Sequence, residues 1–504
     1  MSLLLPLPAV LPLIAAGLSL ALSRLPNVQR TLGVVSLSAA TASAIAVLVH
    51  VQDNGPVAID VGAWPAGIGI TLVADVFAAL LLVISSIVLL VVLVYAIGQP
   101  GTDDGVRFFH PVYLVLAAGV SLAYLTGDLF NLFVAVEVML MASYVLITLG
   151  GNARQVRSGM TYVVINLLAS TALVATIGIV YAATGTVNLA DLASRLDEIP
   201  GPVQLALGAM LFVVFGIKAG IFPLFFWLPD AYPTAPTAVT AIFAGLLTKV
   251  GVYAIIRTQT LLFPSDGPST VLLVVAALTM VIGVLGAIAQ DDVKRILSFH
   301  IISQIGYMIM GLALFSVAGL AGAVFYIVHH IPVKTGLFLI TGLIEQTTGT
   351  GALRRLGGMV RSAPVIAALF AIPGLSLAGI PPFSGFIAKL ALVDAGLADD
   401  QSVIVAISLA VSLLTLFSMA KVWAGVFWGQ PDEPPPLAAA TNGNGDGSST
   451  LSLPHTMVGA TAAIGAVVLA VSFGAGIVWD LSMDAAVGLT DTSGYRIAVL
   501  GVAP

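Results

Sequence analysis

The sequence predicts an all-α polytopic membrane protein with about fourteen transmembrane helices. Of its 504 residues, 59% are hydrophobic and only 8% are charged. Soluble domains carry about a quarter charged residues, so a soluble core of this length would not have so little polar surface. In addition, apolar runs of about 20 residues, the length that crosses a bilayer, follow one another along the chain.

The apolar runs also give the bounds of the expected helices. The first run has neither a basic leading stretch nor a small-residue cleavage site, so we expect a retained helix and not a cleaved signal peptide. The expected spans are residues 3–23, 31–50, 71–98, 109–126, 129–150, 158–184, 203–228, 236–260, 269–290, 296–317, 320–345, 364–396, 401–428 and 456–479.

The basic residues of the loops predict that both termini lie outside the cell, because loops rich in Lys and Arg stay inside. The expected outside segments hold only Arg195, Arg257 and Arg496. The expected inside loops hold Arg24, Arg30, Arg107, Arg154, Arg157, Lys294, Arg295, Arg354, Arg355 and Arg361.

The connections divide the chain into five segments. Alternating residues at 53–72 predict an outer β-hairpin, a stripe of Leu and Ala over 187–199 predicts an interfacial helix, and the Pro/Gly/Ser-rich stretch 431–454 predicts a flexible inside linker. The expected segments are 1–105 (first three spans), 106–262 (spans four to eight), 265–428 (spans nine to thirteen), 429–455 (linker) and 456–504 (last span and an outer tail).

The composition excludes several kinds of chemistry. The chain has no cysteine, so it can form neither disulfides nor thiolate metal sites. Its net charge of −6 is small and scattered, which argues against nucleic acid as a partner. We expect no cofactor, and the sequence assigns no ligands to a metal or to a coupling cation.

Two overlong spans are interrupted by Gly and Pro in similar sequence motifs. AGIFPLFFWLPDA at 219–231 is echoed by AGIPPFSGFIAKLALVDA at 378–395. Interruptions at corresponding positions of two halves indicate broken helices and a pathway near the middle of the bilayer. A repeat that relates spans four to eight to spans nine to thirteen would place both at matching fourth positions. The alternative is that both are simple kinks.

Ionisable residues lie inside the expected spans, where they are costly and usually functional. His330 and Lys334 share one helical face, and His329 points about 100° away. The candidates for the pathway are Glu137, Lys218, Lys249, His330, Lys334 and Lys389. A secondary polar path would comprise His300, Ser303, Gln304, Tyr307 and His329.

This arrangement predicts a proton relay. Burial disfavours the charged form of a lysine and a neighbouring carboxylate favours it, so moving or neutralising the carboxylate releases the proton. Lysines and a histidine spread through the bilayer, with hydroxyls and water between them, can then pass protons along. Histidine suits such a step because it titrates near neutral pH. A relay of this kind requires neither a metal nor a nucleotide.

Each candidate also has a structural alternative. Glu137 and Lys218 can form a static buried pair that fixes helix packing. His329 and the polar path can serve contacts between neighbouring helices. Lys421 is expected to reach the interface from its helix end, and the acidic residues 291–292 are expected to cap a helix and set topology.

These motifs resemble the antiporter-like membrane subunits shared by respiratory complex I, membrane-bound hydrogenases and the Mrp multisubunit sodium/proton antiporters. The resemblance covers residues 1–430, most specifically 107–395. Its motifs are LFNLFVAVEVMLMASYVLI, GIKAGIFPLFFWLPDAYPTAPTAVTAIFAGLLTKVG, DVKRILSFHIISQIGYM, HHIPVKTGLFLITG and AGIPPFSGFIAKLAL. Within the family, FNLFVAVEVMLMASYVLITLGG, YAATGTVNLADLA and RILSFHIISQIGYMIMGL are most similar to the D-type subunits of Mrp complexes.

The resemblance implies fourteen helices with two inverted five-helix repeats, spans four to eight and nine to thirteen, and with broken seventh and twelfth spans. The family's functional glutamate of the fifth helix corresponds to Glu137, and its lysines of the seventh and eighth helices correspond to Lys218 and Lys249. The histidine and lysine of the eleventh helix correspond to His330 and Lys334, and the terminal residue of the twelfth corresponds to Lys389. The repeat is imperfect, because Lys218 precedes its Gly-Pro motif whereas Lys389 follows the corresponding one.

The resemblance also implies a function. The chain would be a proton-translocating subunit of a sodium (or other monovalent cation)/proton antiporter in the plasma membrane of a prokaryote, and not an enzyme. Its partners would be the lipid bilayer, H+ and Na+, and the Mrp subunits of types A, B, C, E, F and G. A proton-pumping subunit of a redox complex would share every relay residue. A mere scaffold is a third hypothesis, which five intramembrane lysines make costly.

Overall fold

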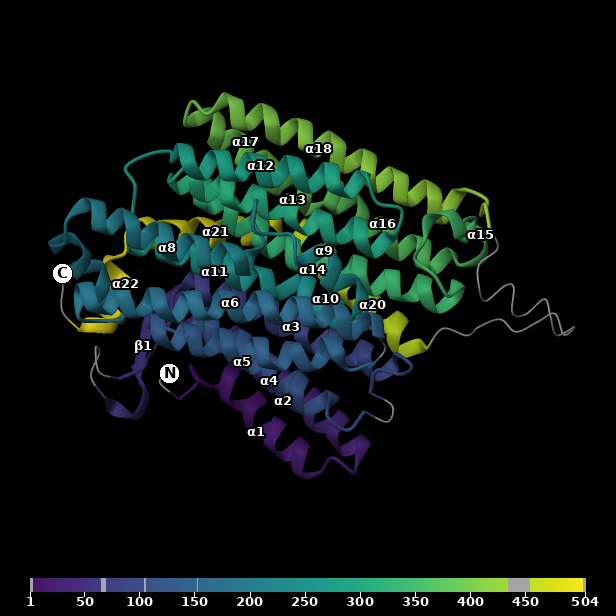
Figure 1. Ribbon diagram of the computed structural model, residues 1–504, viewed down its shortest axis with the longest axis horizontal. Helices are drawn as coiled ribbons and strands as arrows, with labels where there is room; N and C mark the ends of the chain where they lie inside the picture. The colour runs from purple at the N-terminus through teal and green to yellow at the C-terminus, as the bar shows by residue number, and fades with distance from the viewer. Residues whose placement is uncertain (1–2, 65–68, 104–105, 152, 434–453, 502–504) are drawn as a thin grey trace, which may run out of the picture.

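The computed structural model of the protein describes residues 3–64, 69–103, 106–151, 153–433 and 454–501. Figure 1 shows helices that run side by side along the long axis of the molecule. Both chain termini and β1 lie at one end, which we call the termini end, and α15 lies at the other, which we call the linker end.

The described elements are mostly helices. The helices are α1 Leu7–Ala21, α2 Pro26–Asn54, α3 Val76–Gly98, α4 Phe109–Leu125, α5 Leu129–Thr148, α6 Ala153–Thr184, α7 Leu189–Arg195, α8 Gly201–Ala219, α9 Leu228–Ala231, α10 Thr237–Ile242, α11 Thr248–Leu261, α12 Thr270–Ile288, α13 Val293–Ala313, α14 Val317–Thr348, α15 Met359–Ser362, α16 Pro364–Ala378, α17 Ser384–Ala398, α18 Ser402–Trp423, α20 His455–Phe473, α21 Ala475–Thr490 and α22 Ser493–Leu500. The strands are β1 Val57–Asp60 and β2 Thr71–Ala74.

Eleven helices within the described ranges are long and apolar enough to cross a membrane. Three shorter apolar helices, α1, α4 and α16, accompany them. The prediction of a helical polytopic membrane protein is therefore confirmed.

The helices differ in how deeply they are buried. The apolar windows of α14 and of the helix formed by α10 and α11 are completely buried, and that of α13 is 94% buried. Those of α2, α6 and α18 are less than half buried. Polar side chains on α11, α13 and α14 consequently lie in the middle of the bundle, away from lipid.

Two glycines end helices at the predicted interruptions. Gly220 follows α8 with φ 75° and ψ 41°, and Gly379 follows α16 with φ 83° and ψ 42°. Glycine adopts this left-handed conformation without the steric cost of a Cβ, which makes it the usual residue after a helix end. The segments beyond the two breaks differ: Ser384 opens the fifteen-residue α17, whereas only the four-residue α9 follows Gly220.

The expected bounds are wrong in two places. Residues 71–74 do not begin a helix but form β2, which pairs with β1 in antiparallel fashion. The last expected span does not end in a tail, because α20 stops before Gly474 and α21 and α22 continue to Leu500. Leu481, Ala485 and Leu489 recur at helical spacing and are buried, which explains the extra helix.

The same backbone frame occurs twice. At the termini end, residues 127–129 before α5 bond to residues 187–189 after α6, and at the linker end residues 291–293 before α13 bond to residues 351–353 after α14. We call these the first clamp and the second clamp. Adding the same number to both residues of a backbone bond in the first clamp gives a backbone bond in the second clamp. The paired bonds are Leu129 N to Val187 O and Val293 N to Gly351 O, and Leu189 N to Gly127 O and Leu353 N to Asp291 O.

A buried ion pair joins α3 to α11 at the termini end. The Arg257 guanidinium donates to both carboxylate oxygens of Asp75, at 2.6 and 2.7 Å. Asp75 also caps α3 by accepting from the Ala78 N–H. Tyr495 of α22 covers the guanidinium, whose Cζ lies 5.0 Å from the ring centroid.

We expect Arg257→Ala to lower the free energy of unfolding by about 3–5 kcal/mol, because Asp75 would keep a buried charge without a partner. Thermal unfolding of the detergent-solubilised protein measures this. Arg195→Ala is the control, since the Arg195 side chain is 53% exposed in its pair with Asp191 and should cost about 0–1 kcal/mol. Equal losses would contradict the account.

Candidate functional site

The predicted relay residues lie inside the bundle. The side chains of Lys218, Lys249, Lys334 and Lys389 belong to residues that are at most 8% exposed, and His330 is fully buried. Glu137 on α5 is half-buried. The ammonium groups are therefore held away from lipid by the surrounding helices, and each needs polar partners inside the protein.

Lys218, near the end of α8, is held by α6. Its Nζ donates to the Asn166 carbonyl oxygen at 3.0 Å and lies 3.4 Å from the Asn166 side-chain oxygen. It also donates to the Ser170 hydroxyl at 2.9 Å. That hydroxyl in turn donates to the Glu137 carboxylate.

Glu137 and Lys218 are therefore connected through the Ser170 hydroxyl and not by a direct ion pair. The Ser170 hydroxyl lies between the two charges. The proton on Lys218 is thus one hydroxyl away from the carboxylate that could receive it.

An irregular helical turn supports Lys249. Residues 243–247 form a π-helical turn between α10 and α11. Such turns leave carbonyls outside the regular hydrogen-bond pattern and are frequent at functional sites. The Lys249 ammonium donates to the Ala244 carbonyl at 2.6 Å and to the Thr248 hydroxyl at 3.1 Å.

His330 and Lys334 lie on α14 in the middle of the bundle. Both ring nitrogens of His330 and the Nζ of Lys334 are buried, and within the described part of the chain they have no hydrogen-bond partner. Buried polar atoms of this kind are usually satisfied by water.

Lys389 reaches back across the second break. Its Nζ donates to the carbonyls of Leu377 and Ala378, each at 3.2 Å, and to the Ser412 hydroxyl at 3.0 Å. Those carbonyls belong to the last turn of α16, where the helix leaves them without an intrahelical partner. Although Lys218 and Lys389 lie on opposite sides of their breaks in sequence, both ammonium groups are held near a break.

The residues of the predicted secondary path contact neighbouring helices. His300 Nε2 lies 2.8 Å from Ser418 Oγ, and the Tyr307 hydroxyl donates to the Ser408 carbonyl at 2.6 Å, both on α18. Ser303 instead donates to the Met280 carbonyl on α12. These three residues of the secondary path therefore contact two different helices, α18 and α12.

The other two members of that path lie near α14. Gln304 accepts from the Tyr326 hydroxyl, and the Tyr326 ring stacks on the Tyr307 ring at 5.2 Å. His329 Nδ1 lies 2.9 Å from the Ser384 hydroxyl, at the start of α17. His329 thus connects α14 to the second half of the broken helix.

Two expectations concerned helix ends. The Asp292 carboxylate accepts from the Arg295 N–H at 3.1 Å, so the predicted capping role is confirmed. Asp128 caps α5 in the same way, through the Asn131 N–H at 2.7 Å. Lys421 donates to the carbonyls of Ile288 and Gln290 at the end of α12, consistent with a position at the interface.

A polar cluster outside the spans surrounds Asp103 at the linker end. Burial raises the pKa of Asp103, but hydrogen bonds from His110 and from Arg30 outweigh it, so the pKa lies below its ordinary value. Arg30 Nε contacts the carboxylate at 2.7 Å. This contact ties the loop after α3 to α2.

Sequence reasoning missed Asn166, Ser170 and Ser412, which hold the lysines. Uncharged polar residues are common in transmembrane helices, so none stands out alone. The one available signal was the spacing of Asn166 and Ser170, four residues apart on one face of α6.

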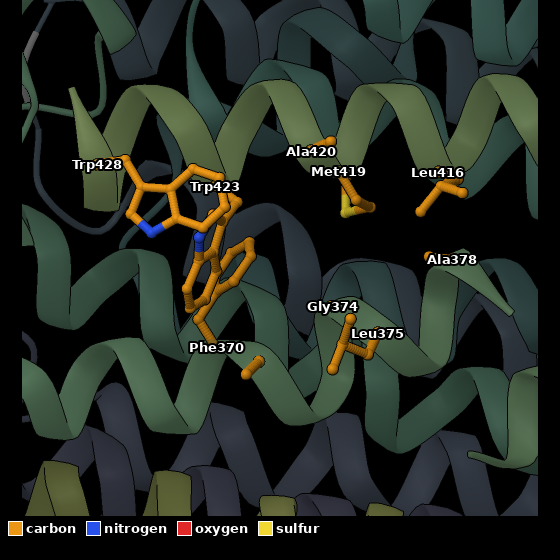
Figure 2. Close-up of a pocket in the computed structure, with 10 residues that line it drawn as sticks. Phe370, Gly374, Leu375, Ala378, Leu416, Met419, Ala420, Trp423 and Trp428 are labelled. Carbon is orange, nitrogen blue, oxygen red and sulfur yellow. The ribbon is translucent and has the colours of Figure 1, made fainter. Parts of the chain in front are cut away.

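The apolar groove between α16 and α18 is separate from this site. It has a volume of about 370 Å³ and is lined only by apolar residues and tryptophans. Figure 2 shows Phe370, Trp423 and Trp428 gathered at one end and Ala378 at the other.

The fold and the buried lysines define a class of membrane subunit that carries charged groups on broken helices. Comparison of the sequence with known protein families identifies the family. Residues 126–415 match the family described as NADH:quinone oxidoreductase/Mrp antiporter, transmembrane region. The chain belongs to this family.

Several relatives and solved structures are similar to the chain. It is 46% identical over 84% of its length to the D-type subunit of the Na(+)/H(+) antiporter of Alkalihalophilus pseudofirmus, of which 87% is covered. It is 39% identical over 85% to the protein of the same name in Bacillus subtilis, of which 88% is covered.

A chain of the Mrp complex from Dietzia sp. DQ12-45-1b superposes with a TM-score of 0.90 at 36% identity, covering 99% of this chain and 100% of that one. A chain of the membrane-bound sulfane sulfur reductase, an archaeal respiratory membrane complex, superposes with a TM-score of 0.87 at 26% identity. The superposition covers 99% of this chain and 100% of that one.

We expect Gly251→Ala to destabilise the protein, because a Cβ there would lie 2.6 Å from the backbone nitrogen of Ala219, next to Lys218. The crossing of α11 and α8 would have to widen, which costs about 1–3 kcal/mol. Gly178→Ala on α6 is the control, since a Cβ there meets nothing within 4 Å and alanine favours helix. Thermal unfolding should show changes of opposite sign, and a stabilised Gly251→Ala variant would contradict this packing.

Proposed function

We propose that the chain is the proton-translocating, D-type subunit of a multisubunit monovalent cation/proton antiporter. Two relatives that are 46% and 39% identical are named as D-type subunits of Na(+)/H(+) antiporters. In this function the chain is a secondary transporter subunit in the plasma membrane, and it works with the Mrp subunits of types A, B, C, E, F and G.

The chain of hydrogen bonds from Lys218 through Ser170 to Glu137 is the observation that supports proton transfer most directly. The ammonium donates to the hydroxyl, and the hydroxyl donates to the carboxylate. When the Lys218 proton moves to the Ser170 oxygen as the Ser170 proton moves to Glu137, the products are an amine and a carboxylic acid. The hydroxyl is regenerated, so Ser170 connects donor and acceptor without changing.

The remaining stations continue the path through the bundle. Lys249 on α11, His330 and Lys334 on α14 and Lys389 on α17 are buried and have few or no charged partners. Transfer between stations requires bridging water, and the unpartnered nitrogens of His330 and Lys334 offer sites for it.

The proposal includes the finer topology. Eleven long helices and three short apolar ones would give fourteen crossings. The two clamps have matching bonds but lie at opposite ends of the molecule, which supports inverted repeats formed by α4 to α11 and by α12 to α18. The linker end carries Lys294, Arg295, Arg354 and Arg355, so it would face the cytoplasm, with both termini outside.

We assign the path of the coupling cation to an interface with another subunit. A row of buried lysines repels sodium, so the relay itself is unsuited to carry it. The proposal for this chain is therefore limited to protons.

The second candidate is a proton-pumping subunit of a redox complex. The similarity to the membrane-bound sulfane sulfur reductase, at a TM-score of 0.87, favours it. The subunits that co-purify with the chain decide between the two: small membrane subunits support the antiporter, and redox subunits support the alternative.

We expect Lys218→Ala and Glu137→Ala to abolish cation/proton exchange in membrane vesicles while the complex still assembles. Each variant removes one partner of the proton transfer. Exchange is measured with a pH-sensitive dye after addition of sodium, and assembly by native gel electrophoresis.

Lys421→Ala is the control, because Lys421 contacts only the end of α12 and the Asp291 carboxylate. It should retain most of the activity. Normal exchange by Lys218→Ala or Glu137→Ala would refute the relay.

We expect Ser170→Ala to slow exchange by about tenfold or more, a loss of the size that removing a proton-transfer group produces. Ser170→Thr keeps the hydroxyl and should recover most of the rate. Ser143→Ala is the control, because its hydroxyl is also buried between α5 and α6 but contacts only Tyr162 and the Leu140 carbonyl. If Ser170→Ala and Ser143→Ala exchange at the same rate, the hydroxyl does not carry the proton.

A further inference from the structure

A polar opening lies at the linker end between α13 and α14. It has a volume of about 370 Å³, and its lining includes Asp292, Lys294, Arg295, Glu345 and Gly351. We call this opening the linker-side mouth. None of these residues belongs to the relay.

An ion pair lies in the mouth. Lys294 Nζ contacts Glu345 Oε2 at 2.7 Å, and the side chains are 9% and 29% exposed, respectively. The Thr237 hydroxyl donates to the same oxygen at 3.3 Å. A Cβ on Gly351 would lie 3.4 Å from the other Glu345 oxygen and 3.0 Å from Asp292 Oδ2, so the glycine leaves both carboxylates accessible.

The first clamp shows that the backbone frame does not require this ion pair. The shift that relates the clamps pairs Lys294 with Phe130 and Glu345 with Tyr181, and it pairs Gly351 with Val187. The frame of hydrogen bonds is the same in both places although the first has two aromatic residues and a valine. The charged pair at the linker end therefore serves something other than holding the frame.

The mouth is aligned with the relay along α14. Glu345 follows Lys334 by three helical turns, so the two lie on one face about 16 Å apart along the axis. Thr341 lies between them on that face. The α3 residue Tyr95 packs against the same stretch and donates its hydroxyl to the Leu339 carbonyl at 2.9 Å.

The charged and titratable groups around Glu345 come from three elements. Lys294, Asp292 and Arg295 come from α13 and its cap, Tyr95 comes from α3, and Thr237 of α10 adds a neutral hydroxyl. Arg295 is engaged by Asp230 at 3.0 Å. Lys294 is thus the cation that directly balances Glu345.

We propose that Glu345, paired with Lys294, is the port through which protons pass between the water at the linker end and the relay at Lys334. A proton from water binds the Glu345 carboxylate and separates the ion pair. The same O–H bond breaks when the proton leaves to water on the α14 face, and the pair re-forms. This role rests on the proposed function of the chain.

The test is exchange by the reconstituted complex with the linker end facing the bath, while only the bath pH is varied. Glu345→Gln keeps the size of the side chain and its bond from Thr237. It should lower the exchange rate by about tenfold or more and flatten the dependence on bath pH. The dependence on pH inside the vesicle should stay unchanged, and Glu345→Asp should recover part of the rate.

Glu433→Gln is the matched control, since Glu433 forms an ion pair of similar length, 2.9 Å, with Arg355 at the same end but outside the mouth. It should behave as wild type. The double variant Lys294→Phe with Glu345→Tyr copies the side chains of the first clamp. It should assemble normally and lose exchange.

Wild-type rate and bath-pH dependence in Glu345→Gln would overturn the port. If Glu345→Gln behaves as wild type but Lys218→Ala abolishes exchange in the same preparation, the proposed function is supported and only the role of Glu345 as a port is refuted. If the wild-type complex exchanges no cation for protons, the proposed function has failed, whatever the Glu345 variants do.

Discussion

The burial of four ammonium groups in the middle of a membrane bundle is the constraint on which the rest of the structure depends. A charge without partners in such a place costs several kcal/mol. For two of the four groups, the chain offsets this cost with carbonyls that lie at irregular parts of the helices. Lys249 takes the Ala244 carbonyl at a π-helical turn, and Lys389 takes two carbonyls at the end of α16. The irregular backbone and the buried charges therefore belong together.

The sequence predicts the parts of this arrangement that depend on charge and on backbone type. Lysines within apolar runs and Gly-Pro interruptions are visible without a structure, and Gly220 and Gly379 end helices where the pattern indicates. The bounds of α21 were missed because Gly474 interrupts the last span and Leu481, Ala485 and Leu489 resume it. The sequence does not reveal the strand at 71–74 because only Asp75 separates its apolar residues from the apolar run of α3.

The partners of the lysines could not be predicted from the sequence. Asn166, Ser170 and Ser412 are ordinary helix residues until the fold places them beside an ammonium group. The separation of Glu137 from Lys218 by a hydroxyl likewise depends on how α5, α6 and α8 pack. Lys389 lies after its break in the sequence, whereas Lys218 lies before its own. Because the Lys389 side chain extends back to α16, the two ammonium groups are nevertheless placed similarly.

The two clamps show how one backbone frame can hold different chemistry. The bonds of residues 127–129 recur at 291–293, yet Phe130 and Tyr181 of the first clamp correspond to the ion pair of Lys294 and Glu345 at the second. Function in such a fold lies in side chains placed on a repeated frame. The fold alone therefore does not say at which end protons enter.

The central claim is that Glu137 gains the proton that Lys218 gives up. Infrared difference spectroscopy of the reconstituted complex, through a pH jump or addition of sodium, measures it directly through the C=O stretch of a protonated carboxyl group. We predict a band of this kind that changes after the pH jump, persists in Glu345→Gln and is missing in Glu137→Gln. The account is contradicted if the band is unchanged in Glu137→Gln, or if wild type shows no change in carboxyl protonation while it exchanges ions.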